Sequence, residues 1–169
     1  MKARAVSLRP LSANVCGQGI RLTRSRSVPK GAKRLAGEVI HSQGYLKFLE
    51  HANSPRNLGM IANPSAAAKV LGICGDSLEV SLIIEDDKIS DINYLPYGCV
   101  HTIACASAMS ELAKGRSLEQ ALELGPEEIE AELGGLPETH KHCARLAVNA
   151  LGEAIADYYK RRHGSSQAA

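Results

Sequence analysis

The chain has 169 residues, of which 44% are hydrophobic, with one Phe and no Trp, so its core must be built from aliphatic side chains. The formal net charge is +2, yet nine of the 20 Lys and Arg residues lie in residues 1–37, which contain no Asp or Glu. The other 11 basic residues face 18 acidic ones, a net charge of about −7, which indicates an acidic folded body with a basic arm.

Residues 1–37 are rich in Arg and Ser and show little periodicity, so we expect a disordered basic arm. The same composition is typical of an organelle transit peptide, which leaves a mitochondrial location open beside the cytoplasmic one that we expect. No run of 18 apolar residues is present, so no membrane span is predicted. Five cysteines without a secretion signal favour a reducing compartment and metal binding over a disulfide framework.

A first helix is predicted from about Leu35 to Ala52, interrupted or restarted near residues 42–44, and it ends before Pro55. Residues 77–84 alternate between apolar and polar, which predicts a strand, and a turn at 86–88 leads into a second strand. Residues 67–73 are expected to add a third antiparallel strand, because an isolated hairpin is only marginally stable.

Beyond Cys99 the apolar period becomes helical, and that helix is predicted to stop at Gly115. Ser117 begins a capping box, Pro126 opens another short helix, and a last helix runs from about His140 to Arg162. The predicted fold class is α+β, a small three-stranded antiparallel sheet with helices packed on one face. Residues 38–163 would form this domain, and residues 164–169 a flexible tail.

Three cysteines lie at the boundaries of these elements, namely Cys74, Cys99 and Cys143. The start of the first hairpin strand and the end of the second are neighbours, so Cys74, Asp76 and Cys99 should meet at one end of the sheet. Cys143 begins the last helix, and we infer that it lies near the same end of the sheet, which the spacing alone does not show. Thiolates with one carboxylate suit zinc, copper(I) or iron–sulfur chemistry. Helix N-termini would also lower the thiol pKa of Cys99 and Cys143.

Other cysteines and histidines carry weaker signals. His142, beside Cys143, is the best candidate for a further ligand, whereas His101 is expected to be a surface or packing residue. Cys105 is predicted to be a small buried residue of the core, the usual role of a single cysteine. A permanent structural zinc stays open, although such sites usually use paired Cys-x2–4-Cys spacing, which this sequence lacks.

A resemblance to a known family rests on four motifs taken in order: Ser54-Pro55-Arg56-Asn57, Cys74-Gly75-Asp76, Tyr97-Gly98-Cys99, and Leu136-Pro137 with His142-Cys143. With them, residues 44–162 resemble the NifU/IscU family of iron–sulfur cluster assembly scaffolds. The resemblance implies that Cys74, Cys99 and Cys143 hold a cluster, that Asp76 keeps it labile, and that His142 is a further or alternate ligand.

The resemblance also implies a carrier and not an enzyme. A cysteine desulfurase would supply sulfur, iron would join it, and a transient 2Fe–2S cluster would pass to apo-proteins. A homodimer, an iron donor and a chaperone are further implied partners, although Glu138-Thr139-His140 departs from the segment that the chaperone recognises in some members.

Two alternatives stay open. One is a zinc-bound sulfurtransferase with zinc on Cys74, Asp76, Cys99 and Cys143, which accepts persulfide sulfur from the desulfurase. The other is a non-metal module whose basic arm contacts nucleic acid, against which the acidic body and the scarcity of aromatic residues argue.

Overall fold

A computed structural model describes the backbone of residues 35–166 and the side chains of residues 44–163. Residues 1–34 of the predicted arm, with Cys16, and residues 167–169 of the predicted tail lie outside this part. Among the described residues, every helix is too short or too polar to span a membrane. The elements follow in chain order: α1 (Leu35–Asn53), β1 (Ala66–Leu71), β2 (Ser77–Glu85), β3 (Lys88–Tyr97), α2 (Val100–Ala113), α3 (Leu118–Leu122), α4 (Pro126–Glu132), the 3₁₀ turn η2 (Glu138–His140) and α5 (Lys141–Ser166).

The three strands form one antiparallel sheet in the order β1-β2-β3, which confirms the predicted third strand. Ser77 at the start of β2 pairs with Tyr97 at the end of β3, so the two segments that carry the site meet at this end of the sheet. At the opposite end Asp86 and Asp87 both have positive φ, as a two-residue hairpin turn with a right-handed twist requires.

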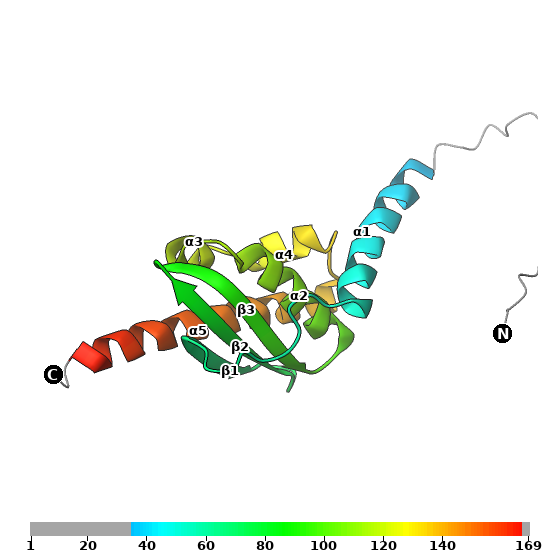
Figure 1. The fold of residues 1–169 in the computed structure, drawn as a ribbon. Helices are drawn as coiled ribbons and strands as arrows, with labels where there is room; N and C mark the ends of the chain where they lie inside the picture. Colours follow the sequence, from blue (N-terminus) through cyan, green and yellow to red (C-terminus); the bar gives the residue numbers. More distant parts are fainter. Residues whose placement is uncertain (1–34, 167–169) are drawn as a thin grey trace, which may run out of the picture. The chain divides into compact units, whose positions relative to one another are not determined.

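Helices α2 and α5 cover one face of the sheet, α5 against β1 and β2 and α2 against β3 (Figure 1). The predicted capping box at Ser117 is present, with Gln120 as its partner, and Pro126 opens α4 as predicted. The core is built mostly from aliphatic side chains, as the composition predicts, with Tyr94 as its one large buried aromatic residue in the described part of the chain. Its other largest fully buried side chains are Leu78, Leu82, Ile89, Ile92, Met109, Leu118, Leu124, Ile129, Leu133, Leu151 and Ile155.

Helix α1 is continuous through residues 42–44, so the predicted interruption is wrong. Gly44 lies against the backbone of Gly134, and a Cβ atom at either position would overlap the other residue. The absence of a side chain at Gly44 therefore lets α1 pack closely against the loop after α4. Gly44 does not mark the end of a helix.

Candidate metal centre

Asp76, Cys99 and Cys143 come together at one end of the sheet. One ligand atom from each lies within 4.8 Å of the others, and the Sγ atoms of Cys99 and Cys143 are 3.9 Å apart. Asp76 lies in the turn between β1 and β2, Cys99 is the N-cap of α2, and Cys143 is in the first turn of α5. Two thiols and a carboxylate in this arrangement form a donor set suited to zinc or ferrous iron.

The Asp76 carboxylate is held by the start of α2. Its Oδ2 atom accepts hydrogen bonds from Thr102 Oγ1 at 2.7 Å and from the Cys99 backbone N–H at 3.1 Å. These bonds, that of Thr102 first, hold the pKa of Asp76 below its usual value, so the carboxylate is charged at neutral pH. The Asp76 carboxylate, which comes from the turn between β1 and β2, therefore caps the N-terminus of α2.

Thr102 was not among the predicted site residues. It is buried, and its hydroxyl also lies 3.6 Å from the Cys99 Sγ atom, so it touches two of the three donors. The only signal in the sequence is a hydroxyl three residues after a cysteine that begins a helix. That spacing does not reveal that the partner carboxylate comes from Asp76.

Two glycines make room for this geometry. Gly75 has φ +89°, a conformation that the tight turn before Asp76 requires and that other residues rarely adopt. Gly98 lies so close to Asp76 that a Cβ atom built there would be 2.7 Å from the Asp76 Cβ atom and closer still to its carboxylate. A side chain at position 98 would therefore displace the carboxylate from the site.

The cysteines differ in burial. Cys74 is exposed, in the loop before Asp76, whereas Cys143 is buried. Burial first, and then the neighbouring Cys99 thiol, raise the pKa of Cys143 to about 11, against a smaller lowering by the contact with Thr102. The predicted lowering of this pKa by a helix N-terminus is therefore wrong for Cys143, because the loss of hydration outweighs the partial charge of the helix. Cys105 is buried in the core, as predicted, and burial raises its thiol pKa strongly.

Cys74 and His142, the other two predicted ligands, are not members of the compact group. Cys74 is near enough to make the weakest of the contacts that lower the Asp76 pKa, after Thr102 and Cys99. The His142 ring lies 6.2 Å from that of His140, centre to centre. The ligand roles of Cys74 and His142 stay predictions.

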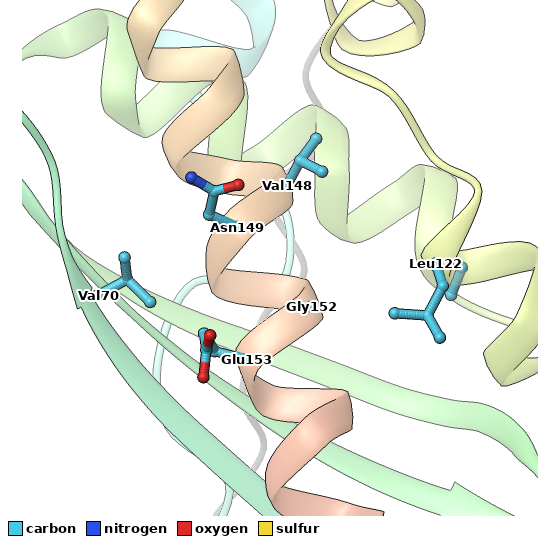
Figure 2. A pocket seen from close by; sticks show the side chains of 7 residues that line it. Val70, Leu122, Val148, Asn149, Gly152 and Glu153 are labelled. Carbon is cyan, nitrogen blue, oxygen red and sulfur yellow. The ribbon is translucent and has the colours of Figure 1, made fainter.

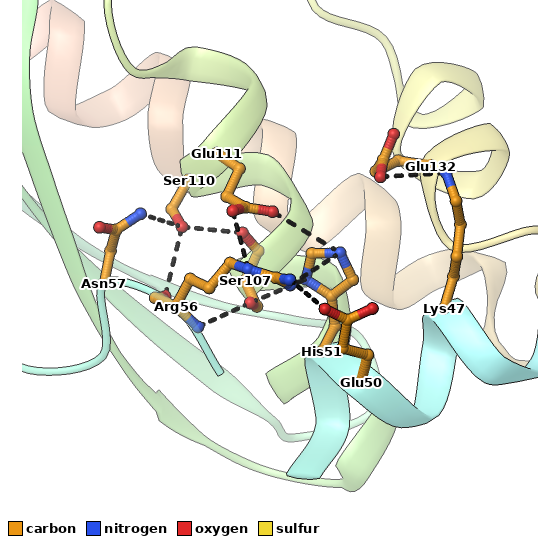
Figure 3. A network of polar contacts seen from close by, with 9 residues as sticks. All are labelled: Lys47, Glu50, His51, Arg56, Asn57, Ser107, Ser110, Glu111 and Glu132. Atoms are coloured by element: carbon orange, nitrogen blue, oxygen red, sulfur yellow. Dashed lines mark hydrogen bonds and ion pairs between the residues drawn. The ribbon is translucent and has the colours of Figure 1, made fainter. Parts of the chain in front are cut away.

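Arg56 and Asn57 are tied to α2 by a network of polar contacts (Figure 3). Arg56 Nε lies 2.8 Å from Glu111 Oε1, and Asn57 Nδ2 donates to Ser110 Oγ at 3.0 Å. The side chains of Arg56 and Asn57 therefore help to position α2, the helix that begins after Cys99.

The same network predicts a pH dependence through His51, whose buried Nδ1 atom lies 2.9 Å from Ser107 Oγ. Burial and then Arg56 lower the pKa of His51 below 6.5, so on acidification the unfolded chain takes up a proton before the folded chain does. The free energy of unfolding should therefore fall below about pH 6.5, with a slope of at most about 1.4 kcal/mol per pH unit. Urea unfolding between pH 7.5 and 5.5 measures it, and His51→Asn should flatten the slope. An unchanged slope in that variant would assign the effect to other groups.

A groove of about 370 Å³ lies between β1, α3 and α5 (Figure 2). Val70, Leu122 and Val148 give it an apolar lining, and Glu153 is its only ionisable side chain. No cysteine or histidine is among the described residues that line this groove, so it is separate from the group of Asp76, Cys99 and Cys143.

The chain is similar to proteins of known families. The model of the NifU-like N-terminal domain matches residues 45–165. The chain is 36% identical over 116 residues to the iron–sulfur cluster assembly scaffold protein IscU 1 of Archaeoglobus fulgidus, covering 68% of this chain and 76% of that protein. It is 34% identical over 122 residues to the iron sulfur cluster assembly protein 1, mitochondrial, of Kluyveromyces lactis, and the match covers 69% of this chain and 67% of that protein.

A solved structure agrees in fold. The crystal structure of the N-terminal part of a nitrogen-fixing NifU-like protein from Brucella abortus superposes with a TM-score of 0.55 at 21% identity, covering 70% of this chain and 97% of that one. The match to the family model spans the sheet, α2 and most of α5, and it includes Asp76, Cys99 and Cys143. The chain belongs to the family of NifU-like N-terminal domains.

Proposed function

We propose that the chain is a scaffold on which an iron–sulfur cluster is assembled and from which the cluster passes to apo-proteins. The observation that carries the proposal is the group of Asp76, Cys99 and Cys143 within 4.8 Å, beside the exposed Cys74. Relatives that are named iron–sulfur cluster assembly scaffolds support it. In this proposal the chain binds the growing cluster, and a partner cysteine desulfurase breaks the carbon–sulfur bond of cysteine.

Burial favours Cys74 as the first acceptor of sulfur. A persulfide on another protein can approach Cys74, which is exposed, more easily than the buried Cys143. In this step the Cys74 thiolate attacks the outer sulfur of the donor persulfide, the S–S bond of the donor breaks, and the donor cysteine leaves as a thiolate. Reduction of this sulfur to sulfide then takes two electrons from a thiol or protein reductant.

Asp76 is the donor that favours release of the cargo. Carboxylate oxygen is a harder and poorer partner for a cluster than thiolate sulfur. Its Oδ2 atom is also engaged by Thr102 and by the Cys99 N–H, and these contacts compete with any metal for the same lone pairs. A site in which one ligand, Asp76, binds weakly suits a 2Fe–2S cluster that is passed on to another protein. Cys99 and Cys143 would be two further ligands, and His142 or Cys74 the fourth.

A second candidate function is a zinc-bound sulfurtransferase. Two thiols and a carboxylate, with Cys74 in the adjoining loop, also suit the four-coordinate zinc that proteins prefer. Zinc would then stabilise the fold while a cysteine carries the persulfide.

One experiment separates the two. The full chain is incubated without oxygen with ferrous iron, cysteine, a cysteine desulfurase and a thiol reductant, and visible and Mössbauer spectra are followed before an apo-ferredoxin is added. A 2Fe–2S spectrum that moves to the ferredoxin is expected, whereas bound zinc with a persulfide and no cluster would favour sulfur transfer. Cys99→Ser should abolish the spectrum, and Cys105→Ala, which changes a core thiol outside the group, should retain it.

The cell compartment and the partners complete the proposal. We place the chain in the cytoplasm, or in a mitochondrion if residues 1–37 act as a transit peptide, as the name of the Kluyveromyces lactis relative suggests. A cysteine desulfurase and apo iron–sulfur proteins are the proposed partners. A chaperone, an iron donor and a second copy of the chain are further candidates.

A further inference from the structure

A pair of stacked imidazoles joins the two segments that carry the Cys99 and Cys143 thiols. The rings of His101 and His140 have their centres 3.7 Å apart and are nearly parallel, at 19°. His101 lies in the first turn of α2, two residues after Cys99, and His140 ends η2, three residues before Cys143. The stack therefore spans the same two elements as the 3.9 Å contact between the Cys99 and Cys143 Sγ atoms.

Other side chains hold this stack in place. The Phe48 ring of α1 packs on His101 with 5.0 Å between centres, and Thr139 Oγ1 lies within hydrogen-bond distance of His140 Nδ1, at 2.9 Å. The contact with Thr139 limits rotation of the His140 ring. Side chains of α1, α2 and η2 thus meet at the imidazole pair, which connects α2 to the segment just before α5.

The geometry does not suit a shared metal ion on these two rings. The lone pair of an imidazole nitrogen lies in the plane of the ring, so two rings stacked face to face direct their lone pairs sideways along nearly parallel planes. Neither histidine belongs to the group of ligand atoms that lies within 4.8 Å in the described part of the chain.

We propose that the His101–His140 stack fixes the separation of Cys99 and Cys143, so that both histidines are positioning residues of the thiol site. The inference rests on the proposed metal-binding function of that site. Without the stack, α2 and the start of α5 could shift relative to each other, and the two thiols would bind a metal ion only after paying the entropy of ordering these segments. Neighbours that orient metal ligands commonly change metal affinity by about 10- to 100-fold.

The test is a titration of the reduced full chain with Co²⁺, followed through the charge-transfer absorption of cobalt–thiolate bonds and the d–d bands of a tetrahedral ion. His101→Ala and His140→Ala should each raise the Kd for Co²⁺ about tenfold or more and weaken the d–d bands. The double variant should be no worse than either single one, since both remove the same contact. His101→Phe, which keeps a flat ring but has no nitrogen, should stay within about twofold of the natural chain.

His163→Ala is the matched control, because it removes an exposed imidazole near the other end of α5. An unchanged Kd and spectrum in both alanine variants would overturn the proposal. Loss of binding in His101→Phe equal to that in His101→Ala would also overturn it, by making the imidazole a ligand. His140 is half-exposed, so its variants test the stack even if His101→Ala does not fold. A natural chain without any cobalt–thiolate band would instead refute the metal site itself, and this proposal with it.

Discussion

Replacing Gly98 by Ala is expected to lower the free energy of unfolding by about 1–2 kcal/mol, the cost of losing a helix cap, and to weaken metal binding. The added Cβ atom would overlap the Asp76 side chain, whose Cβ atom would be only 2.7 Å away. The carboxylate would then leave the Cys99 N–H and the Thr102 hydroxyl, which it accepts from in the present structure. Urea unfolding measures the loss of stability, and competition for zinc with a coloured chelator measures the loss of affinity.

Gly152→Ala is the matched control for this substitution. Gly152 is inside α5, and a Cβ atom there would meet no other atom within 4 Å. Alanine in a helix interior is favoured over glycine, so this variant should be more stable by about 0.5–1 kcal/mol, with unchanged metal affinity. If Gly98→Ala kept both its stability and its affinity for zinc, the close contact with Asp76 would not be needed to hold the carboxylate in the site.

The second large effect is expected at Asp76, where two variants separate its roles. Asp76→Ala and Asp76→Asn should both slow transfer of a cluster to an apo-ferredoxin, by about tenfold, since each removes the charged oxygen donor. Only Asp76→Ala should also lose about 1 kcal/mol of stability, because asparagine keeps an oxygen that can accept from Thr102 and from the Cys99 N–H.

Visible circular dichroism, recorded as the cluster moves between the two proteins, gives the transfer rate for each Asp76 variant. Thr102→Val is the companion variant, because it removes one hydrogen bond to the carboxylate and leaves the charge in place. Faster loss of the cluster from the Asp76 variants than from the natural chain would contradict the assignment of Asp76 as the labile donor.

The sheet could be predicted because its signal is local. Alternation from Leu78 to Ile84 fixes which face of β2 is buried, and the turn at Asp86-Asp87 fixes the pairing with β3. Helix starts at Ser117 and Pro126 were also predictable, since capping depends on residues three or four positions apart. The meeting of Asp76 with Cys99 then followed from the geometry of a hairpin.

Contacts between distant elements could not be predicted in this way. The interruption of α1 predicted near residues 42–44 is wrong, and Gly44 instead lies against Gly134, 90 positions further along the chain. The stack of His101 on His140 likewise depends on how η2 meets α2, which no local period encodes. The pKa of Cys143 was predicted in the wrong direction because burial, a property of the whole fold, outweighs the local helix terminus.

The graded burial of the cysteines also governs how the protein meets reactive chemicals. Cys74 faces solvent, Cys99 is half-covered, and Cys105 and Cys143 are enclosed. Among the cysteines of the described residues, Cys74 is therefore the first that electrophiles and soft toxic metal ions from solvent encounter, while the fold shields the enclosed thiols. Cys74, which we propose as the first acceptor of sulfur, is thus also the described cysteine at which a single covalent adduct would block that step without unfolding the protein.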